Sequence, residues 1–259
     1  FGINAEDFVK DLKEIDEILE KFGAEPFRLW SVVEGNLTKT DFRCSFDRID
    51  GAGKTLTKLW NVAKFISMFP EKKSAKLTEL DKWIINEVHE LITFSKDHYE
   101  KYDFHEPAIR LRHFIWETFA SHYLELAKNR AYNSAKNFTK QEQDAAYYTL
   151  HYCLDNVLKL LAPITPMLIY KIYKDLRKKD IHFESFPKTS KKYKIPFSTE
   201  DIESLNKHIW KAKKDRNISL KEEINSLTIP NKFKIIERDL AITHNAKELK
   251  FGNELDISF

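Results

Sequence analysis

Gly51-Ala52-Gly53-Lys54-Thr55 is the segment whose residue types come closest to a nucleotide-binding motif. A phosphate-binding loop also needs a glycine five positions before Gly53 and a buried strand immediately upstream. Arg48 occupies that glycine position, and residues 47–50 are mostly charged where the strand would be. We therefore interpret the two glycines as a loop ahead of a helix, and we predict no nucleotide site there.

The nine histidines could serve as metal ligands or as proton carriers. They form no His-Glu-x-x-His pair and no cluster with the two cysteines, Cys44 and Cys153. His105, His113 and His122 are too far apart in sequence for one helical turn to bring them to one ion. No Gly-x-Ser-x-Gly segment occurs, and no carboxylate pair stands out. The sequence therefore predicts no catalytic residue, no metal site and no bound cofactor.

Basic and aromatic side chains offer a different chemistry, the binding of phosphates and nucleobases. The net charge is only +3, so the overall balance does not indicate a nucleic-acid partner. The segment from Arg177 to Arg216, however, contains twelve basic and six acidic residues. Such a stretch either holds a phosphate backbone or simply faces solvent, and the residues alone leave both interpretations open.

Segments with an apolar residue at every third or fourth position must position these side chains, and this spacing predicts helices. Helices are expected over residues 6–22, 54–69, 78–99, 103–132 and 139–161, with another beginning at Thr165-Pro166. Thr78 with Asp81, and Thr139 with Glu142, form capping-box patterns at two of the starts. Long helices joined by short loops predict an antiparallel bundle, so the expected fold class is mainly α.

The pattern changes after about residue 180, where shorter elements are expected. These are a strand at 181–186, a lysine-rich linker at 187–196, a helix at 199–214, a strand at 217–221, a helix at 231–243 and a strand near 248–251. Together they predict a small α+β appendage on the bundle.

Composition limits the class of protein and its location. Hydrophobic residues make up 42% and charged residues 32%, a globular balance, and six glycines are too few for a loop-rich β-sandwich. The most apolar stretch, 157–173, is interrupted by Lys159, Pro163, Pro166 and Lys171, so no membrane span is expected. Two cysteines without metal spacing, and no visible signal peptide, favour a cytoplasmic location.

Three segments resemble class Ia aminoacyl-tRNA synthetases in the order expected of that class. KFGAEPFRLW at 21–30 resembles the segment after the KMSKS loop, LWNVAKF at 59–65 a helix of the anticodon-binding bundle, and LAPITP at 161–166 a break between bundle helices. Residues 102–130, with YDFHEPA, FIWE and YLELAKNR, are similar to the valyl-tRNA synthetase family in particular. The alternatives are an isoleucyl or leucyl counterpart, and a non-enzymatic helical module that binds RNA or protein.

The resemblance implies a C-terminal, tRNA-binding part of such a synthetase. Residues 1–50 would follow the catalytic domain as a stem-contact-like connector, 51–179 would form the anticodon-binding bundle, and 180–259 a small α+β subdomain. HIGH and KMSKS signatures are absent from the sequence. The resemblance therefore implies that ATP and Mg²⁺ are used by a catalytic domain outside this sequence. The present sequence would begin just after the KMSKS signature of that domain. The implied partners are valine tRNA and that catalytic domain, and the chain alone is expected to be inactive.

Anticodon recognition requires unpaired bases held by stacking and edge contacts, with lysine or arginine on the phosphates. Lys54, Lys58 and Asn61 fall at i, i+4 and i+7 of the predicted helix 54–69, with Lys64 nearby, and the resemblance places the anticodon near this helix. Alternatively, Asn61 bridges helices and the lysines are only solvated. Trp116 and Tyr123 are expected in the core, and Trp60 falls in the apolar pattern of the helix 54–69. The remaining predicted tRNA-binding residues are Arg112, Lys128, Arg130, Lys191, Lys192 and Lys194.

Overall fold

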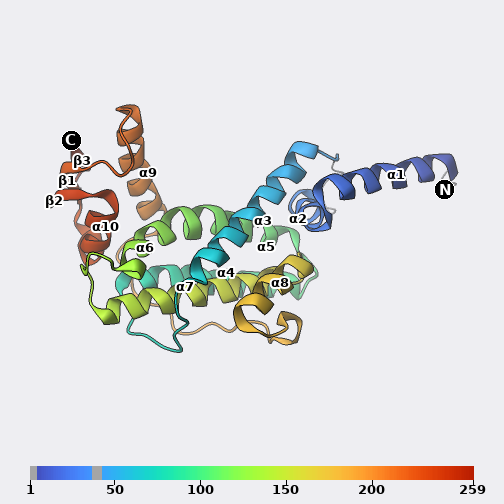
Figure 1. Ribbon diagram of the computed structural model, residues 1–259, viewed down its shortest axis with the longest axis horizontal. Helices are drawn as coiled ribbons and strands as arrows, with labels where there is room; N and C mark the ends of the chain where they lie inside the picture. Colours follow the sequence, from blue (N-terminus) through green and yellow to red (C-terminus); the bar gives the residue numbers. More distant parts are fainter. Residues whose placement is uncertain (1–4, 37–42) are drawn as a thin grey trace. The chain divides into compact units, whose positions relative to one another are not determined.

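The computed structural model describes residues 5–36 and 43–259, and helices dominate it (Figure 1). The helices are α1 (Ala5–Phe22), α2 (Ala24–Glu34), α3 (Phe46–Ile66), α4 (Glu79–Tyr99), α5 (His105–His113), the π-helix η1 (Phe114–Tyr123), α6 (Leu124–Tyr132), α7 (Lys140–Leu161), α8 (Pro166–Arg177), the 3₁₀-helix η2 (Ile181–Phe183), α9 (Thr199–Asp215), the 3₁₀-helix η3 (Asn231–Ile236) and α10 (Glu237–His244). The strands are β1 (Ile224–Pro230), β2 (Ala246–Gly252) and β3 (Asp256–Ser258). The predicted class, mainly α with a small β-containing appendage, is confirmed.

The chain divides into two compact units. Unit 1 contains the described residues of 1–64, 91–115 and 155–187, and unit 2 contains 65–90, 116–154 and 188–259. The long helices α4 and α7 therefore contribute one part to each unit. The three predicted segments, 1–50, 51–179 and 180–259, follow sequence order instead, and they stay a prediction of domain organisation.

In unit 1, α2 is fastened to the turn that precedes α8. The Nε atom of Arg28 donates to the carbonyl oxygen of Ile164 at 2.9 Å. Oε2 of Glu25 accepts the main-chain N–H of Leu168, in the first turn of α8, at 3.1 Å. Thr165 precedes α8 as predicted, but its side chain makes no capping hydrogen bond. A carboxylate from another helix therefore caps α8, where its negative charge also favours the helix N-terminus.

The start of α3 corrects the prediction for the two glycines. The helix begins at Phe46, so Gly51 and Gly53 lie inside it rather than in a loop ahead of it. A Cβ atom on Gly53 would stand 3.6 Å from the ring of Pro26 on α2, so the helix backbone comes close to its neighbour there. The helical conformation of this segment excludes a phosphate-binding loop, because such a loop must leave its N–H groups free for the phosphate.

In unit 2, helix starts and core stripes follow the predicted pattern. The N–H of Thr78 donates to Oδ2 of Asp81 at 3.0 Å, which confirms the capping box of α4. Phe119, Tyr123 and Leu126 are fully buried, as the apolar periodicity predicts. The predicted helix 103–132 is one helical run, but η1 widens its middle into a π-helix.

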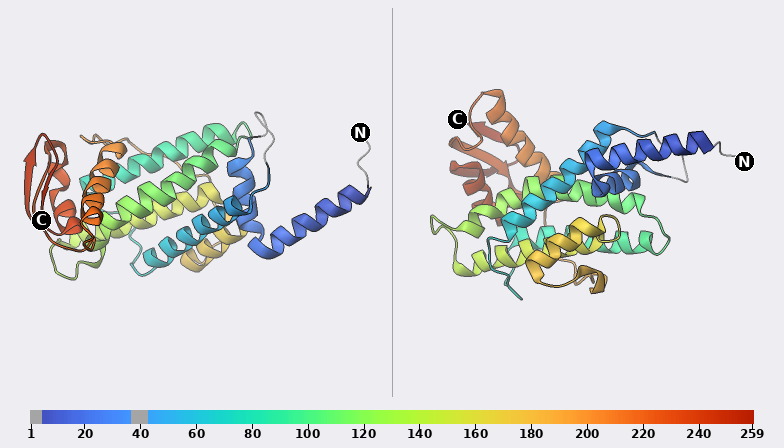
Figure 2. Two further views of the ribbon diagram at one scale, coloured as in Figure 1. Left: turned by 90° about the horizontal axis from the view of Figure 1, so that it is seen from above. Right: turned by 45° about the vertical axis from the view of Figure 1, so that its right-hand side comes forward.

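The appendage is a three-stranded sheet with the order β2-β1-β3, in unit 2. β1 runs parallel to β2 and antiparallel to β3, and α10, on the connection between β1 and β2, packs against β2 (Figure 2). The predicted strand at 217–221 is wrong, because these residues lie in the turns between α9 and β1. The buried Lys213 of α9 holds this region by donating to the carbonyl oxygens of Leu220 at 2.9 Å and His244 at 2.8 Å.

The predicted strand at 181–186 is also wrong, because η2 replaces it. Oδ1 of Asp180 accepts the N–H of His182 at 2.9 Å, and Ile181 is buried. A local side-chain acceptor thus favours a turn over a strand, and the sequence alternation alone does not show this competition.

Two further results concern the described ranges 5–36 and 43–259. No helix in them is long and apolar enough to cross a lipid bilayer. No group of three or more His, Cys, Asp or Glu side chains in them could hold a metal ion.

Candidate nucleic-acid interface

Helix α3 carries four of the predicted RNA-binding residues on one polar face. Lys54, Asn61 and Lys64 are exposed and Lys58 is half-buried, whereas Leu59 on the opposite side is fully buried. We call Lys54, Lys58, Asn61 and Lys64 the α3 polar face. Because Asn61 is exposed, it is not the buried bridge between helices that the sequence left open.

Lys54 is paired within its own helix. Its Nζ atom lies 2.7 Å from Oδ2 of Asp50, one turn earlier, and this hydrogen bond raises the pKa of Lys54. Both side chains are more than half exposed. Water screens an exposed pair of this kind, so a phosphate can replace Asp50 as the partner at little cost.

Two tryptophans are more exposed than the sequence suggests. Trp116, which is predicted to lie in the core, is 37% exposed. Trp60, which falls in the apolar pattern of its helix, is 39% exposed. Its ring lines a pocket of about 480 Å³ in unit 1, together with Thr57 of α3, Pro26 of α2 and Met167 of α8. The lining is largely apolar, and an aromatic ring in such a hollow can stack on a flat group such as a nucleobase. The α3 helix thus offers a polar face and an aromatic pocket.

Three predicted lysines follow one another in a segment that is fastened to α4 in unit 2. Nδ2 of Asn86 donates to the carbonyl oxygen of Tyr193, and Oδ1 of Asn86 accepts the N–H of Tyr193, both at 2.9 Å. The Nζ atom of Lys192 lies 2.6 Å from Oε1 of Glu90. The segment therefore presents its cations at fixed positions although it has no regular secondary structure. The exposed lysines, which we call the lysine strip, are Lys191, Lys192 and Lys194.

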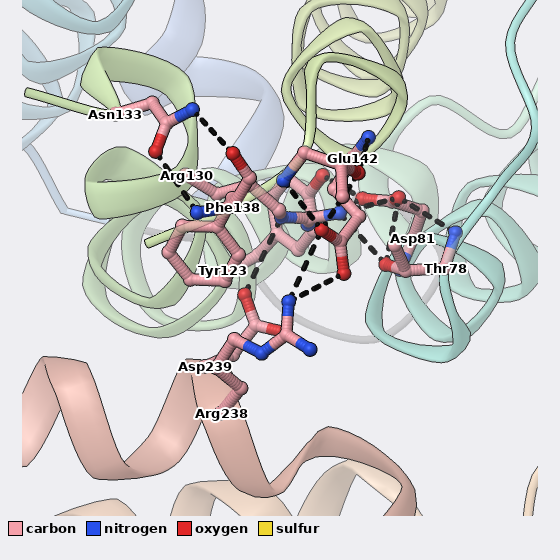
Figure 3. Close-up of polar contacts among 10 residues, drawn as sticks. Thr78, Asp81, Tyr123, Arg130, Asn133, Phe138, Glu142, Arg238 and Asp239 are labelled. Atoms are coloured by element: carbon pink, nitrogen blue, oxygen red, sulfur yellow. Dashed lines mark hydrogen bonds and ion pairs between the residues drawn. The ribbon is translucent and has the colours of Figure 1, made fainter. Parts of the chain in front are cut away.

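The structure contradicts the prediction that Arg130 contacts tRNA, because its side chain is completely buried. Figure 3 shows its polar contacts. Its Nη1 atom donates to Oδ2 of Asp81 and its Nη2 atom to Oδ1, both at 2.7 Å. Nη1 also lies 2.7 Å from the hydroxyl of Thr78, and the hydroxyl of Tyr123 donates to Oδ1 of Asp81 at 2.7 Å. A guanidinium with these partners holds helices together and is closed to solvent.

A second carboxylate approaches the same guanidinium from the appendage. Oδ1 of Asp239 on α10 lies 3.3 Å from Nε of Arg130. Burial acts to raise the pKa of Asp81, but the charge and hydrogen bonds of Arg130 outweigh it and lower that pKa. Burial raises the pKa of Asp239 to about 6 against the attraction of Arg130, and the charge on Asp81 adds to the rise. Asp81 thus keeps the close two-bond contact and Asp239 is the carboxylate that takes up a proton.

The neighbouring residue on α10 makes a similar contact at the surface. Nη1 of Arg238 lies 2.9 Å from Oε1 of Glu142, the carboxylate that closes the capping box of α7 with Thr139 (Figure 3). Here the arginine side chain is 52% exposed. Arg238 and Asp239 together fasten α10 to helices α6 and α7 within unit 2.

The two remaining predicted residues are accessible. Arg112 is exposed on α5, and Lys128 on α6 forms an ion pair with Glu125 one turn earlier. Contact of either side chain with tRNA stays a prediction.

Tyr132, at the end of α6 in unit 2, is a feature that sequence reasoning missed. Its side chain is 52% exposed, and its ring meets the ring of Phe69 edge-on at 5.3 Å between centroids. Tyr132 is the last residue of α6, and Asn133 follows it in the left-handed conformation. The only sequence signal is an aromatic residue next to a turn that contains Lys136.

Comparison with known proteins finds one matching family model and several similar proteins. Residues 81–229 match the family model described as the anticodon-binding domain of tRNA ligase. The chain is 32% identical over 238 residues to the valine–tRNA ligase of Pyrobaculum aerophilum, an alignment that covers 90% of this chain and 30% of that protein. The valine–tRNA ligase of Nanoarchaeum equitans is 32% identical over 233 residues with the same coverage, and that of Ehrlichia canis is 30% identical over 252 residues, covering 92% of this chain and 31% of that protein. The chain thus spans about 30% of the length of these relatives.

Proposed function

The chain belongs to the family of tRNA ligase anticodon-binding domains, and from this premise we propose that it binds tRNA. The family match over residues 81–229 is the observation that carries the proposal. We assign valine tRNA as the cognate partner, because relatives aligned over 90% of the chain are named valine–tRNA ligases.

Two of the described surfaces differ in chemistry, and we assign them different roles in tRNA binding. The α3 polar face, next to the pocket at Trp60, offers amide and ammonium donors beside an aromatic ring, which suits unpaired anticodon bases. The lysine strip offers three exposed cations with a fixed backbone, which suits phosphates and sets the register of the RNA. In this proposal the α3 polar face discriminates between tRNAs, and the lysine strip binds all of them.

For the whole protein we propose the activity of a valine–tRNA ligase, the ATP-dependent attachment of valine to its tRNA, in the cytoplasm. The sequence contains neither HIGH nor KMSKS, so ATP and Mg²⁺ would be used by a catalytic domain outside it. The present chain alone should show only background valine-dependent pyrophosphate exchange. Pyrophosphate exchange clearly above background would contradict the proposal that the catalytic domain lies outside this sequence.

Binding of separate tRNA transcripts tests the proposed function. Valine, isoleucine and leucine tRNAs are titrated with the protein at one fixed salt concentration, because affinities at different salt cannot be compared. We expect valine tRNA to bind tightest, by about tenfold or more if base contacts discriminate. Preference for isoleucine or leucine tRNA would reassign the specificity, and absence of tRNA binding would refute the proposal.

A further inference from the structure

The short helix η2, in unit 1, exposes an aromatic ring to an unusual degree. The side chain of Phe183 is 90% exposed, the highest value for a large apolar side chain in the part of the chain that the structure describes. A phenylalanine at the surface forgoes the gain from burying its ring. Exposure of a ring can indicate a binding surface when the backbone around it is fixed by hydrogen bonds and packing. In such a segment, local unfolding does not explain the exposure.

The backbone around Phe183 is held on both sides. Ile181, two residues earlier, is 3% exposed and anchors the turn in the core. The carboxylate of Asp180 accepts the N–H of His182 at 2.9 Å. After the ring, Oε2 of Glu184 lies 3.2 Å from Nζ of Lys159 on α7. The turn therefore projects Phe183 from a fastened base.

Two further rings accompany Phe183, one on α8 and one in η2 itself. The ring of Tyr170 on α8 is parallel to the imidazole of His182, with 6.1 Å between centroids and 7° between planes. The Nζ atom of Lys174 donates to the hydroxyl oxygen of Tyr170 at 2.6 Å and lies 5.0 Å from the centre of its ring. We call Tyr170, His182 and Phe183 the aromatic platform.

The platform stands in a positively charged setting. Residues 171–184 contain five basic and three acidic side chains. Asp175 is paired with Lys171 at 3.3 Å. Lys174, by contrast, is bonded to a phenol oxygen, and Lys178 donates to the main-chain carbonyl of Asp175 at 2.9 Å. The hydrogen bonds of these two lysines are to uncharged oxygens, although Asp175 and Asp180 also act on the charge of Lys174. With five basic against three acidic side chains, the segment keeps a net positive charge beside the rings.

We propose that the aromatic platform is a second RNA-binding surface, on which an unpaired base of the tRNA stacks against His182 and Phe183. Lys174 and Lys178 contact the adjoining phosphates. Flat rings flanked by lysines are the combination that binds single-stranded nucleic acid without regard to sequence. A protein partner would favour a wide apolar surface, whereas here the exposed ring of Phe183 lies in a segment, residues 171–184, that contains eight charged side chains. The inference rests on the proposed tRNA binding and adds a site that the resemblance does not imply.

Removal of the rings tests the stacking contact. The protein with His182→Ser and Phe183→Ser is compared with the parent for binding of the valine tRNA transcript. The matched control is Tyr102→Ser, since Tyr102 is 87% exposed in the same unit and lies outside the platform. Stacking of one base predicts about 5- to 150-fold weaker binding for the double variant, and less than about twofold change for the control. Thermal unfolding should be unchanged in all three proteins, because the replaced rings are exposed.

The cations are tested through the salt dependence of binding. Replacement of Lys174 and Lys178 by glutamine should reduce the slope of log affinity against log salt by about 1.4, the value for two contacts to single-stranded RNA. An unchanged slope contradicts phosphate contact by these lysines.

Oxidative footprinting separates an RNA partner from a protein partner. Phe183 should be oxidised by hydroxyl radicals in the protein alone and protected when valine tRNA is added. Protection before tRNA is added would mean that protein already covers the ring, which overturns the proposal. Parent-like tRNA binding by the double variant overturns the platform alone, whereas absence of tRNA binding by the parent overturns the proposed function as well.

Discussion

Arg130 holds Asp81 through two hydrogen bonds of 2.7 Å, and both side chains are completely buried. The same carboxylate closes the capping box at the start of α4. At the start of α7, Glu142 has the same two roles, as capping carboxylate and as partner of Arg238, but at the surface. The chain therefore contains a buried and an exposed version of one arrangement, which can be compared directly.

Replacement of Arg130 by methionine should lower the free energy of unfolding by about 3–5 kcal/mol, because two buried carboxylates lose their common partner. Arg238→Met, the exposed counterpart, should cost only about 0.2–1 kcal/mol. Urea unfolding of both variants and the parent measures the difference. Equal losses of unfolding free energy in the two variants would contradict the view that burial makes the Arg130–Asp81 pair more stabilising than the Arg238–Glu142 pair.

Asp239 should make stability depend on pH in a window from about 4 to 6. Its pKa is raised to about 6 in the folded protein, whereas an unfolded aspartate titrates near 3.8. The folded state therefore binds a proton that the unfolded state has released, and this contribution to stability is lost as the pH rises through 6. The groups that face Asp239 are Arg130, Asp81, Glu142 and Arg238.

The variant Asp239→Asn isolates this contribution, since asparagine does not titrate and the other groups are common to both proteins. The unfolding free energy of the parent, relative to that of the variant, should decrease between pH 4.5 and pH 7. Parallel pH profiles for the two proteins would contradict the raised pKa of Asp239.

Glu25 should contribute more to the free energy of unfolding than Thr165, the residue in the N-cap position of α8. Loss of its hydrogen bond to the N–H of Leu168, as in Glu25→Ala, should cost about 0.5–2 kcal/mol of stability. Thr165→Val should be close to neutral, because the hydroxyl of Thr165 makes no capping hydrogen bond. Thermal or urea unfolding distinguishes the two variants, and the opposite ranking would restore Thr165 as the cap.

The lysine strip should contribute to the affinity for every tRNA alike. Replacement of Lys191, Lys192 and Lys194 by glutamine should weaken binding and reduce the salt slope by up to about 2.7, or about 0.9 for each phosphate that no longer meets a lysine. The control removes the same charge from exposed positions in the appendage region, with Lys221, Lys247 and Lys250 replaced by glutamine. If both triple variants keep the slope of the parent, the strip is only a solvated surface.

Local signals predicted much of the helical fold. The capping boxes that begin at Thr78 and Thr139 are side-chain patterns within four residues, and both are present where the sequence places them. Gly51 and Gly53 misled the prediction, because helix propensity is weak compared with packing, and Gly53 faces Pro26 from another helix. Strand β1 escaped notice because its partners β2 and β3 lie later in the chain.

The candidate site was predictable to the extent that it depends on spacing along one helix. Spacing brought Lys54, Lys58 and Asn61 to one face of α3, and the structure confirms that shared face. Periodicity cannot show that Arg130 is buried, because its partner Asp81 lies 49 residues away in sequence. Only tertiary structure separates a surface arginine from one that is enclosed in the core.

The proposal that the α3 polar face reads the anticodon is tested most directly by two transcripts that differ only there. One is valine tRNA, and the other is the same tRNA with its anticodon replaced. The parent protein should bind the first about 5- to 150-fold more tightly, the range for about 1–3 kcal/mol of base discrimination. In Asn61→Ala with Lys64→Gln this ratio should fall toward one, while the unfolding free energy changes by less than about 0.5 kcal/mol, since both residues are exposed. Equal dissociation constants of the parent protein for the two transcripts would contradict anticodon recognition by this chain.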